Sequence, residues 1–217
     1  MRAFALLVAA LALTAAACNS GSDQAGQEPI PPRPAATQQQ PATQPSAPAS
    51  SAHFTKRQLG RAALQPADAP NGMRYTRVDS GRKSLAQIGY IVDRQISQVR
   101  DLGFQAVYDA TFDSTTTDVR LASRLWLFAK PEGAQKWLEK TAQDSQTYGF
   151  EPISAPPLGD DAWAGKGNVG ADVITYAFRT GNLVVVTSYE TQSEQLSQSA
   201  KLAAAEKAAE RAASAAA

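Results

Sequence analysis

Two adjacent acidic residues, Asp160 and Asp161, are the strongest candidates for catalytic chemistry in this sequence. Neighbouring carboxyl groups can act as general acid and general base when their surroundings separate their pKa values. No partner for the pair is evident, and both acids follow Gly159, which is typical of a turn. His53 is the sole histidine and stands where the expected domain begins, so a serine or cysteine nucleophile lacks a histidine base within the domain. We therefore predict no enzymatic activity, with an enzyme built on Asp160 and Asp161 as the alternative.

Two further patterns could bind a cofactor or a metal. The run Gly165-Lys-Gly-Asn-Val-Gly170 fits the G-x-G-x-x-G pattern, but a dinucleotide site needs that loop to open a helix, whereas here a strand is expected to follow. Asp109, Asp113 and Asp118 could suggest a calcium loop, yet Arg124 stands where such a loop needs its bidentate glutamate. We expect a hairpin and solvated turn acids, with no cofactor and no metal.

Aromatic side chains could line a ligand cleft, because their rings bind flat apolar or sugar surfaces well. The members of this set are Trp126, Trp137, Trp163, Tyr75, Tyr90, Tyr108 and Tyr176. Packing in a core is the favoured interpretation for most of them.

The single cysteine, Cys18, is the candidate acceptor for a lipid. Arg2 precedes an uncharged apolar run from Phe4 to Ala17, which has the length of a signal h-region and is too short for a permanent span of roughly 20 residues. The three alanines before Cys18 resemble a lipobox. That resemblance implies a signal peptide over residues 1–17, cleavage before Cys18 and transfer of a diacylglyceryl group to its thiol. A plain secretory signal with an incidental cysteine is the alternative.

The segment that follows is a predicted linker, so that lipidated cysteine and linker together span residues 18–52. Residues 19–52 hold seven of the thirteen prolines and almost no large apolar side chains. Such a segment cannot bury enough surface to offset its ordering entropy, so we expect disorder. Its 34 residues would span roughly 30 Å as a coil.

Residues 53–217 are expected to form one domain. Capping boxes at Thr55–Gln58, Ser84–Gln87 and Thr191–Glu194 predict helices that begin behind each of them, the first from Lys56 to about Gln65. Behind the second box, apolar residues recur at the helical spacing up to Leu102, and Gly103 suits the left-handed position after a helix. Pro131 opens a further helix that Gly149 closes. The final Ala-rich helix has little to bury and should fray at its end.

Strands are expected between these helices. Alternation predicts strands at 104–112 and 119–128, and it places Phe104 and Ala106 on one face of the first strand. In the second strand Trp126 and Phe128 lie on the face opposite Leu121, Leu125 and Leu127, so its far end should be covered on both sides. A weaker strand is expected at 73–79. Segments 162–166, 173–180 and 183–190 are separated by glycine turns, which predicts an antiparallel meander. The fold class is therefore α+β, with one antiparallel sheet flanked by helices.

Three stretches carry a resemblance to known families. Leu64-Gln-Pro-Ala-Asp-Ala-Pro-Asn-Gly72 resembles the opening of many uncharacterised bacterial envelope lipoproteins. The run from Leu158 to Ala162, and that from Phe178 to Val186, resemble the end of those domains. The domain is also similar to the sensor-domain and LpqN-like lipoproteins of actinobacteria, which use a PsbP/Mog1-type sheet. The resemblance implies a binding or accessory role in the envelope.

The charge balance bears on partners. A formal net charge of +1 provides no global field that would attract nucleic acid, so none is expected as a partner. Cations nevertheless outnumber acids at the start of the domain. A solvated basic face is the favoured interpretation, and contact with an anionic leaflet is the alternative. The basic residues are Lys56, Arg57, Arg61, Arg74, Arg77, Arg82 and Lys83, against Asp68 and Asp79.

The sequence therefore predicts an extracytoplasmic lipoprotein, bound to a bacterial membrane through lipid on Cys18. Its domain is expected to be a non-enzymatic module that binds an envelope protein, a lipid or a cell-wall ligand. A structural spacer remains a further alternative, and it predicts no concave pocket.

Overall fold

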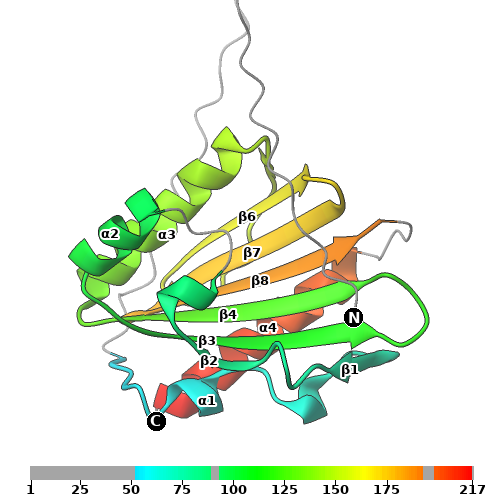
Figure 1. The fold of residues 1–217 in the computed structure, drawn as a ribbon, viewed down its shortest axis with the longest axis horizontal. Helices are drawn as coiled ribbons and strands as arrows, with labels where there is room; N and C mark the ends of the chain where they lie inside the picture. The colour runs from blue at the N-terminus through cyan, green and yellow to red at the C-terminus, as the bar shows by residue number, and fades with distance from the viewer. Residues whose placement is uncertain (1–51, 89–92, 193–197, 217) are drawn as a thin grey trace, which may run out of the picture. The chain divides into compact units, whose positions relative to one another are not determined.

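The computed structural model describes residues 52–88, 93–192 and 198–216. The predicted signal segment, Cys18 and the linker up to residue 51 lie outside the described residues. The helices are α1 (Leu59–Ala62), α2 (Asp93–Asp101), α3 (Pro131–Thr147) and α4 (Gln198–Ala216). The strands are β1 (Met73–Tyr75), β2 (Gly81–Lys83), β3 (Phe104–Ser114), β4 (Arg120–Phe128), β5 (Glu151–Pro152), β6 (Asp161–Asn168), β7 (Asp172–Thr180) and β8 (Leu183–Thr191) (Figure 1).

All eight strands belong to one antiparallel sheet, which confirms the predicted α+β class. The strand order is β1-β3-β4-β8-β7-β6-β5, and β2 also pairs with β3. Strands β6, β7 and β8 form the predicted meander, and β8 then pairs with β4. Both β1 and β2 lie along the same outer side of β3, β1 opposite its end and β2 opposite its middle.

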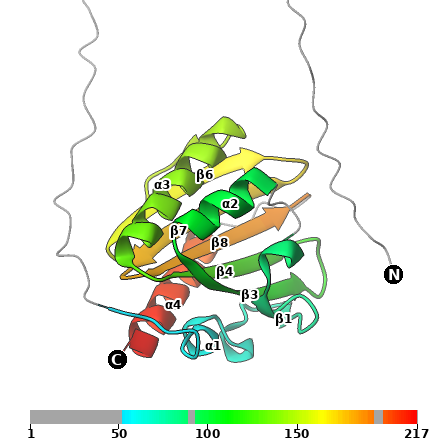
Figure 2. The same cartoon turned by 60° about the vertical axis from the view of Figure 1, so that its left-hand side comes forward.

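Helices cover both faces of the sheet, so there are two hydrophobic cores. Helices α1 and α4 cover one face, and α2 and α3 cover the other (Figures 1 and 2). Strand β4 contributes to both cores, as predicted. Leu121, Leu125 and Leu127 are buried on the α4 side, whereas Trp126 and Phe128 are buried on the α3 side.

The predicted alternation in β3 is wrong at its first residue. Phe104 was expected to share a face with Ala106, but it packs in the opposite core, beside Trp126 and Phe128. The register shifts between Phe104 and Ala106, whose partners on β4 are consecutive residues. This irregularity is a β-bulge at Gln105, and one extra residue in a strand moves its neighbour to the other face.

The helix predicted behind Ser84 is interrupted. Its capping box is formed, with the Ser84 amide donating to Gln87 Oε1 over 2.8 Å, but only a 3₁₀ turn (Leu85–Gln87) follows. Ile88 leaves helical geometry with φ −90° and ψ 82°, and the described chain resumes in α2. Gly103 follows α2 with φ +81°, so this predicted terminator is confirmed.

The first helix is also shorter than predicted. Of the predicted Thr55–Gln58 box, the Thr55 amide donates to Gln58 Oε1 over 2.8 Å, but α1 begins only at Leu59, directly after Gln58. The helix ends at Ala62, because Ala63 is extended with ψ 154°.

The end of the Ala-rich helix α4 is buried, contrary to the predicted fraying. Ala205, Ala208 and Ala212 are each at most 1% exposed, and Ala215 is 7% exposed. Small methyl groups let the helix pack closely on the sheet and on α1, so alanine here is a core residue. The Gln58 side chain also donates to the Ala215 carbonyl over 2.9 Å. The third predicted capping box includes Glu194, which lies outside the described residues.

Candidate functional site

The acid pair Asp160 and Asp161 is bound by an arginine. Arg179 Nη1 lies 2.9 Å from Asp160 Oδ2, and its Nε donates to Asp161 Oδ2 over 2.8 Å. The side chains of Asp160 and Arg179 are 5% and 7% exposed. Asp160 Oδ2 also accepts the Gly181 amide over 2.8 Å. The pair therefore ties the start of β6 to the β7–β8 turn.

This arrangement is unsuited to general acid–base catalysis. A catalytic carboxyl group must reach a substrate and exchange its proton, whereas Asp160 is held by a buried guanidinium and by a backbone amide. Gly159 explains the close approach, because a Cβ there would overlap the Arg179 carbonyl oxygen. Asp160 and Asp161 are structural ion-pair residues in this fold.

The three predicted turn acids do not converge on one point. Asp109 is bound by Arg124, and Asp113 accepts from the Thr76 hydroxyl over 2.8 Å. Asp118 accepts the Gln192 amide over 2.6 Å. Among the described residues, no three His, Cys, Asp or Glu side chains gather as a metal site.

The glycines of Gly165–Gly170 serve packing rather than phosphate binding. Gly165 and Gly167 lie in β6, and the run leads into β7, so no helix opens behind it. A Cβ at Gly165 would overlap the ring of Trp163, and one at Gly167 would press on Phe150. The predicted hairpin is confirmed.

Most of the described aromatic residues belong to the core. Trp126 and Trp137 are buried with ring centroids 5.0 Å apart, and Phe128 packs against Trp137. Tyr176 is 2% exposed. Tyr90 lies outside the described residues. Core packing, the favoured interpretation, is confirmed for Trp126, Trp137 and Tyr176.

Tyr75 and Tyr108 lie together at the margin of the α4-side core. Both are half-buried. Burial, together with the hydrogen bond and charge of Tyr75, raises the pKa of Tyr108 above its ordinary value.

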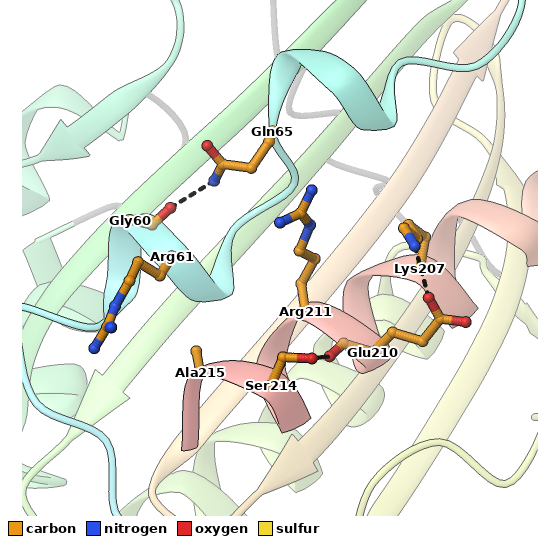
Figure 3. A pocket seen from close by; sticks show the side chains of 8 residues that line it. All are labelled: Gly60, Arg61, Gln65, Lys207, Glu210, Arg211, Ser214 and Ala215. Atoms are coloured by element: carbon orange, nitrogen blue, oxygen red, sulfur yellow. Dashed lines mark hydrogen bonds and ion pairs between the residues drawn. The ribbon is translucent and has the colours of Figure 1, made fainter. Parts of the chain in front are cut away.

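The basic residues at the start of the domain separate into different places. Arg61 borders a depression of about 600 Å³ between α1 and α4, together with Gln65, Lys207, Glu210 and Arg211 (Figure 3). Two of the three cations that line this depression are paired with acids. Lys207 Nζ lies 2.8 Å from Glu210 Oε2, and Nε and Nη2 of Arg211 each donate to Asp68 over 2.8 Å.

Asp68 is a buried carboxylate in this network, with a side chain only 4% exposed. Burial acts to raise the pKa of Asp68, but hydrogen bonds from Arg211 and the Gln65 amide outweigh it. The charges of Arg211 and Lys207 add to them, so the pKa is lowered overall. This contact joins the Leu64–Gly72 segment to α4 and is structural.

A second depression, the basic groove, has a different character. Its volume is about 550 Å³. Its lining residues are Lys56, Arg82, Lys83, Ser84, Leu85, Ala86, Arg100, Phe104, Gln105 and Ala106. Four of these ten are cationic and none is acidic. The ion pairs formed by the described residues all involve other cations.

The groove exists because β2 is short. Strand β2 pairs with β3 only as far as Lys83 opposite Val107, and the chain then turns away at Ser84. The first residues of β3, Phe104–Ala106, therefore border the groove. Lys56 and α2 complete its rim. Four cations that form no ion pair with an acid of the described residues, together with the apolar lining, suit an anion that carries an apolar portion.

The sequence identified three of the four cations of the groove. Lys56, Arg82 and Lys83 stand in the basic opening of the domain, but Arg100 is contributed by α2 and was missed. Helical periodicity predicted that Val99 is buried and that Arg100 faces solvent. No local signal in the sequence shows which strand lies beside Arg100.

Comparison with known proteins bears on the fold. No family model and no curated protein matches this chain. The chain is similar to the extracellular domain of PknH from Mycobacterium tuberculosis, with a TM-score of 0.51 and 13% identity. The match covers 74% of this chain and 97% of that domain. At this identity the similarity shows a common fold alone.

Proposed function

We propose that this chain is an extracytoplasmic lipoprotein of a bacterial cell envelope, anchored through lipid on Cys18. The observation that carries the proposal is the position of its only cysteine, directly behind an apolar segment and three alanines. Two or three acyl chains on one residue hold a protein firmly, since each buried methylene contributes roughly 0.8 kcal/mol. No helix within the described residues has the length and apolar character needed to cross a bilayer.

We further propose that the domain is a non-enzymatic binding or accessory module. The strongest acid pair, Asp160 and Asp161, is bound by Arg179, which argues against the catalytic alternative. The structural neighbour is the extracellular domain of PknH, and that location supports an extracytoplasmic place for this chain. In this proposal residues 18–52 act as the tether between lipid and domain.

The anchor is tested by Cys18→Ser in the full precursor. The variant keeps the export segment and loses the only acyl acceptor, so labelling by a radioactive fatty acid should disappear. The processed chain should move from the membrane fraction to the soluble fraction. Ser22→Ala, four residues further on, is the matched control and should leave both properties unchanged.

Precursor and processed protein must be separated by gel mobility, because an uncleaved precursor stays bound through its apolar segment. Equal labelling of Cys18→Ser and the unchanged chain would overturn the proposal. A processed Cys18→Ser chain that remains wholly in the membrane fraction would overturn it as well.

A further inference from the structure

We infer that the basic groove binds the phosphate groups of an anionic phospholipid surface, so that the domain itself docks on the membrane. This inference deepens the proposed function and rests on it, because the anchor at Cys18 would keep the domain beside a leaflet. The groove provides four cations from three separate places in the fold, namely the turn before α1, strand β2 and helix α2.

The charges are available for a ligand. Lys56, Arg82 and Arg100 are exposed, and none of the four cations forms an ion pair with an acid of the described residues. Arg82 Nη2 donates to the Lys56 carbonyl over 2.8 Å, which fixes one side of the rim. Guanidinium and ammonium groups that line one groove suit phosphate oxygens.

The apolar residues near these cations favour a lipid surface over a free anion. Phe104 and Ala86 lie on the groove wall. Val78 is 83% exposed, and its backbone carbonyl accepts a hydrogen bond from Lys83 Nζ over 3.4 Å, so the residue that carries this exposed apolar side chain contacts one of the four cations. Cations beside exposed apolar groups are typical of proteins that lie at a membrane interface.

The point where the chain enters the domain lies at the same end of the sheet as the basic groove. Phe54 is bonded to Asn182, and the Asn182 side chain also donates to the carbonyl of Phe128, which pairs with Phe104. Lys56 follows two residues later and lines the groove. The tether from Cys18 therefore joins the domain beside the groove, which allows the lipid anchor and the groove to engage one leaflet.

The test uses the chain from residue 18 onward with Cys18→Ser, which lacks both acyl group and signal segment. Its partition is measured by flotation with vesicles of phosphatidylcholine alone and of phosphatidylcholine mixed with phosphatidylglycerol. We expect binding only to the anionic vesicles, and binding should weaken as salt rises, because exposed charges are screened.

The groove is tested by Lys83→Gln/Arg100→Gln. Each cation beside an anionic leaflet raises the partition coefficient about fivefold. Because the variant loses two cations, its partition coefficient should fall about thirtyfold. The control, Arg74→Gln/Lys136→Gln, removes the same charges from exposed sites outside the groove and should reduce partition by less than about threefold. Lys56→Gln/Arg100→Gln is a second groove pair, for use if the first fails to fold by circular dichroism.

Three results would overturn the inference. They are equal losses in groove and control variants, equal binding to neutral vesicles, and binding that does not weaken with salt. Saturable binding of inorganic phosphate or glycerophosphate without vesicle partition would assign the groove to a free anion instead and reject the lipid surface. The flotation assay uses an unacylated chain, so a negative result there rejects the groove and does not affect the Cys18 anchor. Loss of the labelling difference would likewise reject the anchor and leave the flotation result unchanged.

Discussion

The side chain of Asn182 binds the backbone of Phe54 on both sides, although the two residues are 128 positions apart. The Phe54 amide donates to Asn182 Oδ1 over 2.7 Å, and Asn182 Nδ2 donates to the Phe54 carbonyl over 3.1 Å. Nδ2 also donates to the Phe128 carbonyl over 2.7 Å, and Asn182 is only 1% exposed. One turn residue thus fixes the point where the chain enters the domain.

Replacing this asparagine should destabilise the domain. Asn182→Ala leaves the Phe54 amide and two carbonyls without their partner, and each buried unsatisfied group costs about 1 to 3 kcal/mol. We expect the free energy of unfolding to fall by about 3 kcal/mol in a urea melt. Asn168→Ala is the control, since Asn168 occupies the exposed β6–β7 turn. Similar losses in both variants would contradict a special role for Asn182.

The Arg179 ion pairs predict a second, larger effect. Arg179→Met leaves the Asp160 carboxylate buried without its counter-charge, and breaking a buried pair costs about 3 to 5 kcal/mol. Arg120→Met is the matched control, because Arg120 binds Asp79 and Asp113, whose side chains are both 46% exposed. Exposed pairs contribute about 0 to 1 kcal/mol. The measurement is again chemical unfolding, and a loss below about 1 kcal/mol for Arg179→Met would show that the cluster is not structural.

Much of the fold followed from local signals in the sequence. The alternation of Leu125 and Leu127 against Trp126 sufficed to place both faces of β4, because side chains along a strand alternate strictly. Pro131 and Gly149 marked the limits of α3 through backbone chemistry that needs no tertiary contact.

Features that depend on distant contacts did not follow. The bulge at Gln105 results from how β3 fits β4, and the burial of Ala212 depends on α1 and the sheet, so neither has a local pattern. The role of Arg179 did not follow either, because the predicted strand began only at residue 162. In the structure β6 pairs Asp161 with Arg179, and opposite charges on paired strands favour an ion pair.

The contact of Asp68 with Arg211 predicts a pH dependence. The pKa of Asp68 is lower in the folded protein than its ordinary value of 3.8. The folded state therefore holds fewer protons than the unfolded state between these two values. The stabilisation is fully present above the unfolded pKa and is lost as the pH falls through the folded pKa.

Comparison with Asp68→Asn isolates this effect. The difference in unfolding free energy between the original chain and the variant should be constant above about pH 5 and should shrink below about pH 4. Glu206→Gln, at an exposed acid on the same helix as Arg211, is the control and should show a smaller difference. A difference for Asp68→Asn that grows as the pH falls would have the wrong sign for this contact.

Two helical glycines give opposite predictions for the same substitution. A Cβ at Gly133, in the first turn of α3, would overlap the backbone carbonyl oxygen of Leu102. Because a backbone atom cannot rotate away, α3 must shift, and Gly133→Ala should cost about 1 to 3 kcal/mol.

A Cβ at Gly60 in α1 would meet only Tyr108 Cε2 at 3.7 Å, an ordinary contact. Alanine is the better helix former, so Gly60→Ala should stabilise by up to about 1 kcal/mol. Thermal melts of the two variants measure the contrast directly. A melting temperature that does not fall for Gly133→Ala would contradict the packing of α3 on Leu102, and one that falls for Gly60→Ala would contradict the ordinary contact at Gly60.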